Sequence, residues 1–204
     1  MSIINKQDYK LCILAAGKGT RNTCVSGLHK ALLPLENKAA ISHIIRSVPS
    51  HIEIVIAVGH KHKQVESYVQ SVFCDRKIDF AHVENYDGEG SGPGYSLLQC
   101  KEYLQTPFIF TSADTIVKEV EMLDSLEENW LGVSHIDPNE SSKYCLADGN
   151  EYLEKLYYGR GERAYIGMAG VHDYASYWKH LEDGNYSHGE YQVISGFKGL
   201  KEAS

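Results

Sequence analysis

The chain has 204 residues, 43% of them hydrophobic and 10% aromatic, which is enough to build one well-buried domain. Its formal net charge of −7 argues against broad, sequence-independent binding to nucleic acid, because that mode needs a basic face. No apolar run approaches the roughly 18 residues of a membrane span, and the first ten residues lack the apolar core of a signal peptide. Five cysteines without a Cys-x-x-Cys pair fit a reducing compartment. We therefore expect a cytoplasmic protein with no membrane partner.

Strand-length apolar runs alternate with amphipathic segments through the first part of the chain. Alternation of this kind predicts an α/β fold with a mostly parallel sheet and right-handed crossovers. Binding sites of such sheets lie beyond the carboxyl ends of the strands. The expected strands cover residues 11–14, 53–58, 78–83 and 107–111, and the expected helices cover 40–48, 63–73 and 94–104.

The later part of the chain has a different character, with short apolar runs separated by turn-rich stretches. The sequence Asp148-Gly149-Asn150 between two such runs predicts a hairpin. We expect strands at residues 131–136, 144–147, 152–157 and 165–171. The whole prediction is a three-layer, Rossmann-like sheet flanked by helices, extended by a mixed sheet, in a single domain over residues 1–204.

The most informative motif is Leu-Ala-Ala-Gly-Lys-Gly-Thr-Arg at residues 14–21, directly after the first apolar strand. Glycines at a strand end let backbone N–H groups approach an anion, because no Cβ intervenes. Arg21 and Lys30 add mobile positive charge, which favours a polyphosphate ligand. The spacing does not fit a P-loop, and the dinucleotide fingerprint would need glycine at Asn22.

Two further features lie after later strands. The glycine-rich cluster at residues 88–94 reads either as a flexible loop or as part of a binding site. The apolar strand before Thr111 runs directly into Asp114, which could cap a turn or hold a cation. Ten histidines occur without a His-Glu-x-x-His or Cys/His cluster, so no histidine metal site is expected.

Residues 14–21, followed by His29-Lys30-Ala31-Leu32-Leu33-Pro34, resemble the signature of the nucleotidyltransferases that activate sugar phosphates and phosphocholine. In that signature a proline stands where this chain has His29. The resemblance covers roughly residues 8–196 and implies a nucleotide-binding half at 8–116 and an acceptor-binding half at 117–204. It implies catalytic roles for Arg21 and Lys30 and Mg²⁺ binding by Asp114. It also implies that the nucleotide is bound by Leu14, Ala15, Ala16, Gly17, Gly19, Thr20, Glu84, Asn85, Gly90, Ser91 and Gly92.

Acceptor binding is implied for Glu154, Lys155 and Gly170. Each has an alternative interpretation, because a Glu-Lys pair is often plain surface and a strand glycine can serve close backbone packing. Arg160 and Arg163 could instead receive the acceptor phosphate. A second metal-binding aspartate, which the family usually has near the C-terminus, is missing here. Glu190 is the residue that could replace it.

The predicted function is Mg²⁺-dependent transfer of a nucleoside monophosphate from CTP or UTP to a phosphorylated sugar or small phospho-alcohol, with release of pyrophosphate. Such an enzyme would supply cell-surface polysaccharide or related biosynthesis. One alternative is a catalytically impaired nucleotide-binding regulatory subunit. Another is a nucleotidyltransferase for a different acceptor, such as the molybdenum cofactor. The fourteen tyrosines, many of them late in the chain, are compatible with a homodimer but do not require one.

Overall fold

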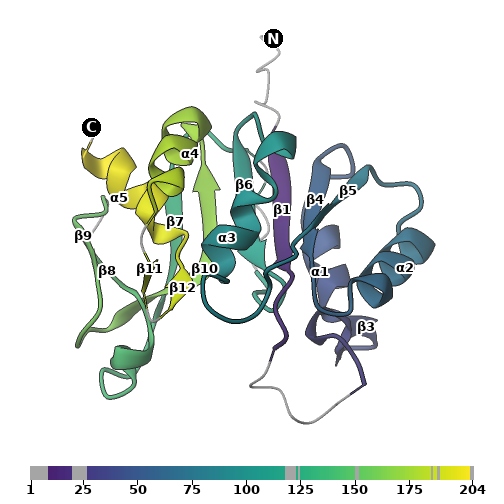
Figure 1. Cartoon of the computed structure of the whole chain (residues 1–204), viewed down its shortest axis with the longest axis horizontal. Coiled ribbons are helices and arrows are strands. Elements are labelled where there is room, and N and C mark those ends of the chain that lie inside the picture. Colours follow the sequence, from purple (N-terminus) through teal and green to yellow (C-terminus); the bar gives the residue numbers. More distant parts are fainter. Residues whose placement is uncertain are drawn as a thin grey trace, which may run out of the picture.

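A computed structural model describes residues 9–19, 27–117, 123, 125–149, 152–184, 186–187 and 189–202 of the chain. One eight-stranded sheet runs through both halves of the molecule (Figure 1). Its first four strands are parallel and lie in the order β5-β4-β1-β6. They are β1 (Lys10–Ala15), β4 (Glu53–Val58), β5 (Ile78–His82) and β6 (Phe108–Ser112). All four strands predicted for this half are confirmed, and no bound differs by more than one residue.

The remaining strands of this sheet are antiparallel to their neighbours. β10 (Arg163–Val171) pairs with β6, with β7 (Trp130–His135) and with β8 (Leu146–Asp148). β8 in turn pairs with β9 (Lys155–Tyr157), which confirms the predicted hairpin. Parallel pairing is therefore confined to the first half, and the second half is the predicted mixed extension.

Helices cover both faces of the sheet, which confirms the three-layer α/β architecture. Side chains alternate across β1: Leu11 and Ile13 belong to one core cluster, and Cys12 and Leu14 belong to the other. The cluster of Leu11 is closed by α1 (Ala40–Arg46) and α2 (His62–Val72). The cluster of Cys12 is closed by α3 (Pro93–Leu98), α4 (Tyr174–Glu182) and α5 (Ile194–Glu202).

The helix predicted at residues 94–104 is shorter in the structure. α3 ends at Leu98 and is followed by the 3₁₀ turn η2 (Lys101–Tyr103). Leu97, Cys100 and Leu104 are all fully buried, so the turn keeps the apolar stripe against the sheet although the α-helix has ended. The periodicity identified the buried positions correctly and overestimated the length of the helix.

Several elements were not predicted from the sequence. Two are the helices α4 and α5, and the others are short. The short elements are η1 (Lys30–Leu32), β2 (Pro34–Leu35), β3 (Lys38–Ala39), η4 (Ser141–Lys143), β11 (Tyr186–Ser187) and β12 (Glu190–Tyr191). Among the described residues, none of the helices has the length and apolar character needed to cross a membrane.

Candidate nucleotide site

Two of the predicted site residues, Lys30 and Asp114, form an ion pair. Asp114 follows β6, and β6 lies beside β1 in parallel, so the carboxyl ends of these two strands share one edge of the sheet. The Nζ atom of Lys30 lies 3.2 Å from Oδ2 of Asp114. Gly19 lies beside this ion pair, since a Cβ added to Gly19 would lie 3.1 Å from the Lys30 side chain. Gly19 also has a φ of +63°, a conformation that glycine adopts without strain.

The carboxyl group of Asp114 is held in its charged form. Burial alone would raise its pKa, but the charge of Lys30, with hydrogen bonds from Lys30 and Ser112, outweighs burial and holds the pKa below its ordinary value. The Asp114 side chain is nevertheless 61% exposed, so a ligand can reach it. The turn that carries it is braced, since Thr115 Oγ1 donates to the carbonyl of Ile166 and lies 2.9 Å from Ser112 Oγ. The result is an accessible carboxylate on a well-supported turn.

Lys30 owes its position to the residue before it. His29 is 1% exposed and caps the turn η1 through its ring, because Nδ1 accepts a hydrogen bond of 3.1 Å from the Ala31 amide. The backbone N–H of His29 donates to Oε1 of Gln64 on α2, and Nε2 of Gln64 donates to the Gly27 carbonyl. The lysine therefore stands on a turn that is tied to the body of the molecule. Sequence reasoning noted His29 only as a departure from the family motif.

The signature loop lies against the loops that follow β4 and β5. The His60 amide donates to the carbonyl of Ala16 at 2.9 Å, and the rings of His60 and Tyr86 lie 6.0 Å apart. Lys18 forms an ion pair with Asp87, which lies just before the glycine-rich cluster. The two loops predicted to bind the nucleotide are thus direct neighbours.

Residues of the glycine-rich loop make many of their contacts within the loop. Ser91 Oγ donates to the carbonyl of Gly88 at 2.7 Å, and Asn85 Nδ2 donates to the carbonyl of Glu89 at 3.3 Å. The segment before α5 packs directly on this loop, because the Tyr191 amide donates to the Ser91 carbonyl at 2.8 Å.

Glu190, the residue considered for the missing carboxylate, lies beside this loop. Its Cβ would be 3.1 Å from a Cβ added to Gly92. The structure therefore places Glu190 next to the glycine-rich loop that is predicted to bind the nucleotide. Glu84 is exposed just before that loop.

Thr20 and Arg21 lie outside the described residues, so their predicted roles stay predictions. Leu14, Ala15 and Ala16 are buried at the end of β1, and Gly17 follows them. A Cβ added to Gly17 would meet no described atom within 4 Å, and Gly17 has no left-handed φ. Packing within the described part of the chain therefore gives no reason for glycine at this position.

The residues predicted to bind the acceptor are not all brought together. Lys155 is the first residue of β9, and Glu154 directly precedes it. The Glu154 amide donates to the Asp148 carbonyl, and Lys155 Nζ lies 5.3 Å from the centre of the Tyr157 ring. Gly170 lies in β10 between Ile109 of β6 and Trp130 of β7. A Cβ there would lie 2.2 Å from Nε1 of Trp130 and 2.6 Å from Leu126, so close packing explains this glycine.

Gly167, which the sequence suggested only as a glycine for close backbone packing, lies much nearer to Asp114. It has a φ of +80°, and a Cβ there would lie 2.9 Å from Ser112 Oγ and 3.8 Å from Thr115 Oγ1. The register of β10 against β7 shifts between Tyr165 and Ala169, at this same point. A second glycine within a predicted strand was the available signal, but it does not distinguish a bulge from a packing position.

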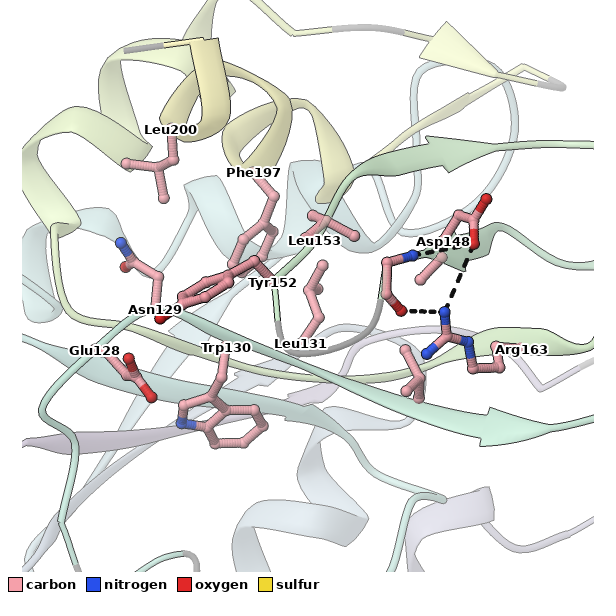
Figure 2. A pocket seen from close by; sticks show the side chains of 13 residues that line it. Glu128, Asn129, Trp130, Leu131, Asp148, Tyr152, Leu153, Arg163, Phe197 and Leu200 are labelled. Atoms are coloured by element: carbon pink, nitrogen blue, oxygen red, sulfur yellow. Dashed lines mark hydrogen bonds and ion pairs between the residues drawn. The ribbon is translucent and has the colours of Figure 1, made fainter. Parts of the chain in front are cut away.

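A cavity of about 450 Å³ lies in the second half, between β7, the tip of the β8–β9 hairpin and α5 (Figure 2). Phe197 and Leu200 of α5 form one wall. At one end Arg163 donates to the Gly149 carbonyl and lies 3.6 Å from Asp148, so its guanidinium is already engaged.

The opposite end of this cavity is remote from Asp114. Asn129 lines that end and accepts a hydrogen bond from the amide of His172, just after β10. β10 ends opposite Phe108, at the amino end of β6, whereas Asp114 follows the carboxyl end. Gly19, Lys30 and Asp114 are not among the residues that line the cavity.

Comparison with known proteins identifies the class. The profile of the MobA-like NTP transferase domain family matches residues 11–168. The chain belongs to this family of nucleotidyltransferases, and the predicted resemblance is confirmed at that level.

Curated relatives and solved structures agree with the assignment. The chain is 30% identical over 132 residues to the bifunctional protein GlmU of Methanococcus vannielii, which covers 63% of this chain and 30% of that protein. It is 29% identical over 133 residues to GlmU of Methanococcus maripaludis, with the same coverage. It therefore spans less than a third of the length of these relatives.

Three solved structures share the fold. UDP-glucose pyrophosphorylase in complex with UDP-glucose superposes with a TM-score of 0.77 and 16% identity, over 97% of this chain and 88% of that one. The inositol-1-phosphate CTP transferase of T. maritima gives 0.71 and 15%, over 97% and 83%. The CTP:phosphocholine cytidylyltransferase of Streptococcus pneumoniae gives 0.69 and 20%, over 86% and 77%.

Proposed function

We propose that this protein is an enzyme that transfers a nucleoside monophosphate from a nucleoside triphosphate to the phosphate of a small acceptor, releasing pyrophosphate. The acceptor class is a phosphorylated sugar or a small phospho-alcohol, and CTP or UTP is the favoured donor. The observation that carries the proposal is that Lys30 and Asp114 form an ion pair beside Gly19 of the signature loop. Membership of an NTP transferase family gives independent support.

The donor set suits Mg²⁺. Within the described part of the chain, no group of three or more His, Cys, Asp or Glu side chains could hold a metal ion. A single ionised, accessible carboxylate such as Asp114 is what Mg²⁺ uses when phosphate oxygens and water complete its shell. When bound, the ion would supply charge neutralisation between the phosphates and orient them. Asp114 is the residue proposed to hold it, and Glu190 remains the candidate for a second carboxylate.

The protein's own groups supply positioning and charge. In this proposal the backbone around Gly17 and Gly19 contacts the triphosphate, while Lys30 and Arg21 balance its negative charge. An acceptor phosphate oxygen then attacks the α-phosphorus in line and pyrophosphate leaves. A phosphate monoester is already nucleophilic near neutral pH, so no general base is needed. Lys30 is paired with Asp114 in the free protein. Nucleotide binding would therefore draw the Lys30 ammonium group away from Asp114 and toward the phosphates.

Pyrophosphate release tests the proposal. Each of the four ribonucleoside triphosphates is combined with Mg²⁺ and with glucose 1-phosphate, inositol 1-phosphate or phosphocholine, the acceptor types suggested by the names of the structural relatives. Acceptor-dependent release with at least one pair supports the proposal. Nucleotide binding without release for any pair would instead favour the regulatory-subunit alternative.

A further inference from the structure

His29 is buried at the start of the turn η1, and in the described part of the chain one of its ring nitrogens has no partner. The ring is 1% exposed, and among the described residues Nε2 makes no hydrogen bond. A buried polar atom without a partner is destabilising, so its presence calls for an explanation. Capping of the Lys30 turn explains only the other nitrogen.

The contacts of the ring fix its protonation state. Nδ1 accepts from the Ala31 amide at 3.1 Å, so it carries no proton. The pKa of His29 is lowered to about 4, first by burial and then by the charges of Lys30, His60 and Lys61. The ring is thus neutral near pH 7, and its single proton lies on Nε2. His29 therefore presents a neutral N–H donor in a fixed tautomer.

The backbone of Gly17 lies close enough to the ring to raise the pKa of His29 against the larger effects of burial and charge. A backbone group raises a histidine pKa when its carbonyl faces a ring N–H, so the Gly17 carbonyl faces the ring although Nε2 makes no hydrogen bond among the described residues. In a trans peptide the C=O of one residue and the N–H of the next point in opposite directions. A Gly17 carbonyl turned toward His29 directs the Lys18 N–H outward, to the side where a phosphate would bind.

We propose that His29 is a positioning residue for the triphosphate, whose Nε2–H donates to the Gly17 carbonyl when a triphosphate is bound. The inference rests on the proposed function, because it assumes that the loop binds a triphosphate. Gly17 has no Cβ, and no described atom would restrain one, so its peptide plane needs another group to fix it. His29 joins the two parts of the site, since Nδ1 supports the turn of Lys30 and Nε2 supports the loop.

Two substitutions separate these roles. His29→Asn places an amide oxygen close to the position of Nδ1, so it keeps the cap but removes the Nε2 donor. His29→Gln places an amide N–H close to the position of Nε2. The same change on α4, His180→Asn, is the matched control, because within the described part of the chain the ring of His180 bonds to the Ser176 carbonyl of its own helix.

Binding of the four nucleoside triphosphates with Mg²⁺ is measured by calorimetry, together with the melting temperature. We expect His29→Asn to melt near the wild type but to weaken binding about tenfold or more, the scale of a lost hydrogen bond in a charged site. His29→Gln should recover most of this affinity, and His180→Asn should bind as the wild type. In ¹⁵N NMR of the free protein, His29 should be the Nε2–H tautomer, and its proton should exchange more slowly once nucleotide is added.

The outcomes distinguish this inference from the proposed function. Unchanged binding in His29→Asn, equal weakening in the Asn and Gln variants, or an Nδ1–H tautomer would overturn the inference alone. Nucleotide binding without pyrophosphate release would overturn the proposed function alone. Absence of nucleotide binding in the wild type would overturn both.

Discussion

At the residue scale, the central feature is one lysine shared between the protein's own carboxylate and the expected phosphates. Lys30 is 23% exposed in its side chain, and its ion pair with Asp114 is accessible to solvent. Accessible pairs contribute little to stability, with typical values of about 0–1 kcal/mol. The pairing therefore points to a role in ligand binding more than in folding.

Substitution of the two cations should affect turnover strongly. We expect Lys30→Ala and Arg21→Ala each to lower turnover by about 100-fold or more, because each removes one charge-stabilising group from the reaction. Steady-state pyrophosphate release measures this effect. The control is Lys143→Ala on η4, which removes an exposed ion pair with Glu140 just before that turn. It should leave turnover unchanged. Near-normal rates in both test variants would contradict the assignment.

The buried ring of His29 should make stability depend on pH. Its pKa is about 4 in the folded protein against an ordinary 6.5, so between these values the unfolded chain binds more protons than the folded one. The free energy of unfolding should therefore fall as the pH drops from about 6.5 to 4, and this residue should have no effect above that range. The maximal loss is roughly 3 kcal/mol.

Urea unfolding of the wild type and of His29→Asn at several pH values isolates this effect. The difference between the two proteins should grow on acidification in the stated direction. If the two curves run parallel from pH 7 to pH 4.5, the ring is not held neutral.

At the element scale, the loops at the carboxyl ends of β1 and β5 use their glycines for different reasons. Gly92 has a φ of +133°, and a Cβ there would lie 2.7 Å from the Tyr191 carbonyl oxygen. Gly17 has no positive φ, and a Cβ added to it would meet no described atom within 4 Å.

This contrast predicts opposite phenotypes. Gly17→Ala should leave the melting temperature unchanged or slightly higher, since alanine reduces the entropy of the unfolded chain, but it should weaken nucleotide binding by blocking backbone approach. Gly92→Ala should lower the melting temperature because the backbone and the segment of Tyr191 must both shift. Thermal unfolding with calorimetric titration measures both properties. Normal nucleotide binding by Gly17→Ala would show that the ligand does not approach this backbone.

The glycines of β10 give a second element-scale prediction. Gly170→Ala should destabilise the protein by about 1–3 kcal/mol, because the new methyl group would overpack against Trp130 and Leu126. Gly167→Ala should reduce both stability and turnover, since the new methyl group would disturb Ser112 and Thr115 beside Asp114. Denaturant unfolding and pyrophosphate release, measured on both variants, separate packing from function. A large loss of turnover with normal stability in Gly170→Ala would restore its predicted acceptor role.

At the scale of the whole molecule, the junction of β6 and β10 joins the parallel and antiparallel parts of the sheet. α4 packs over this junction through Trp178, whose ring stacks on Phe108 at 5.0 Å with an interplanar angle of 17°. The indole N–H also donates to the Leu104 carbonyl at 3.1 Å. One buried aromatic group on α4 thus contacts both the segment that follows η2 and the strand β6.

We propose that both halves unfold as one unit, and Trp178 provides the test. Trp178→Ala should lower the free energy of unfolding by roughly 3–5 kcal/mol while keeping a single transition. Hydrogen exchange should show amides of β4 and β10 losing protection together. Tyr152→Ala is the aromatic control, because its side chain is 76% exposed and should cost no more than about 0.5 kcal/mol. Separate transitions for β4 and β10 would divide the chain into two domains.

The sequence by itself determined the parallel half of the fold and the nucleotidyltransferase signature after β1. Central strands buried on both faces produce continuous apolar runs, and a glycine-rich strand end with following cations is a local signal, so both can be read without a structure. α4 and the role of Gly167 could not be read in this way. The buried positions Tyr177, Trp178 and Leu181 fit a helix, but nothing local distinguishes them from the tyrosine-rich strands nearby.

Only the tertiary structure decided which residues meet. The pairing of Lys30 with Asp114 joins residues 84 positions apart, and it depends on β1 and β6 lying side by side. The burial of His29 against Gln64 and the separation of Gly170 from Asp114 depend on packing in the same way. Spacing along a chain fixes local geometry, whereas distances between strand ends are set by sheet order, which emerges only when the core is assembled.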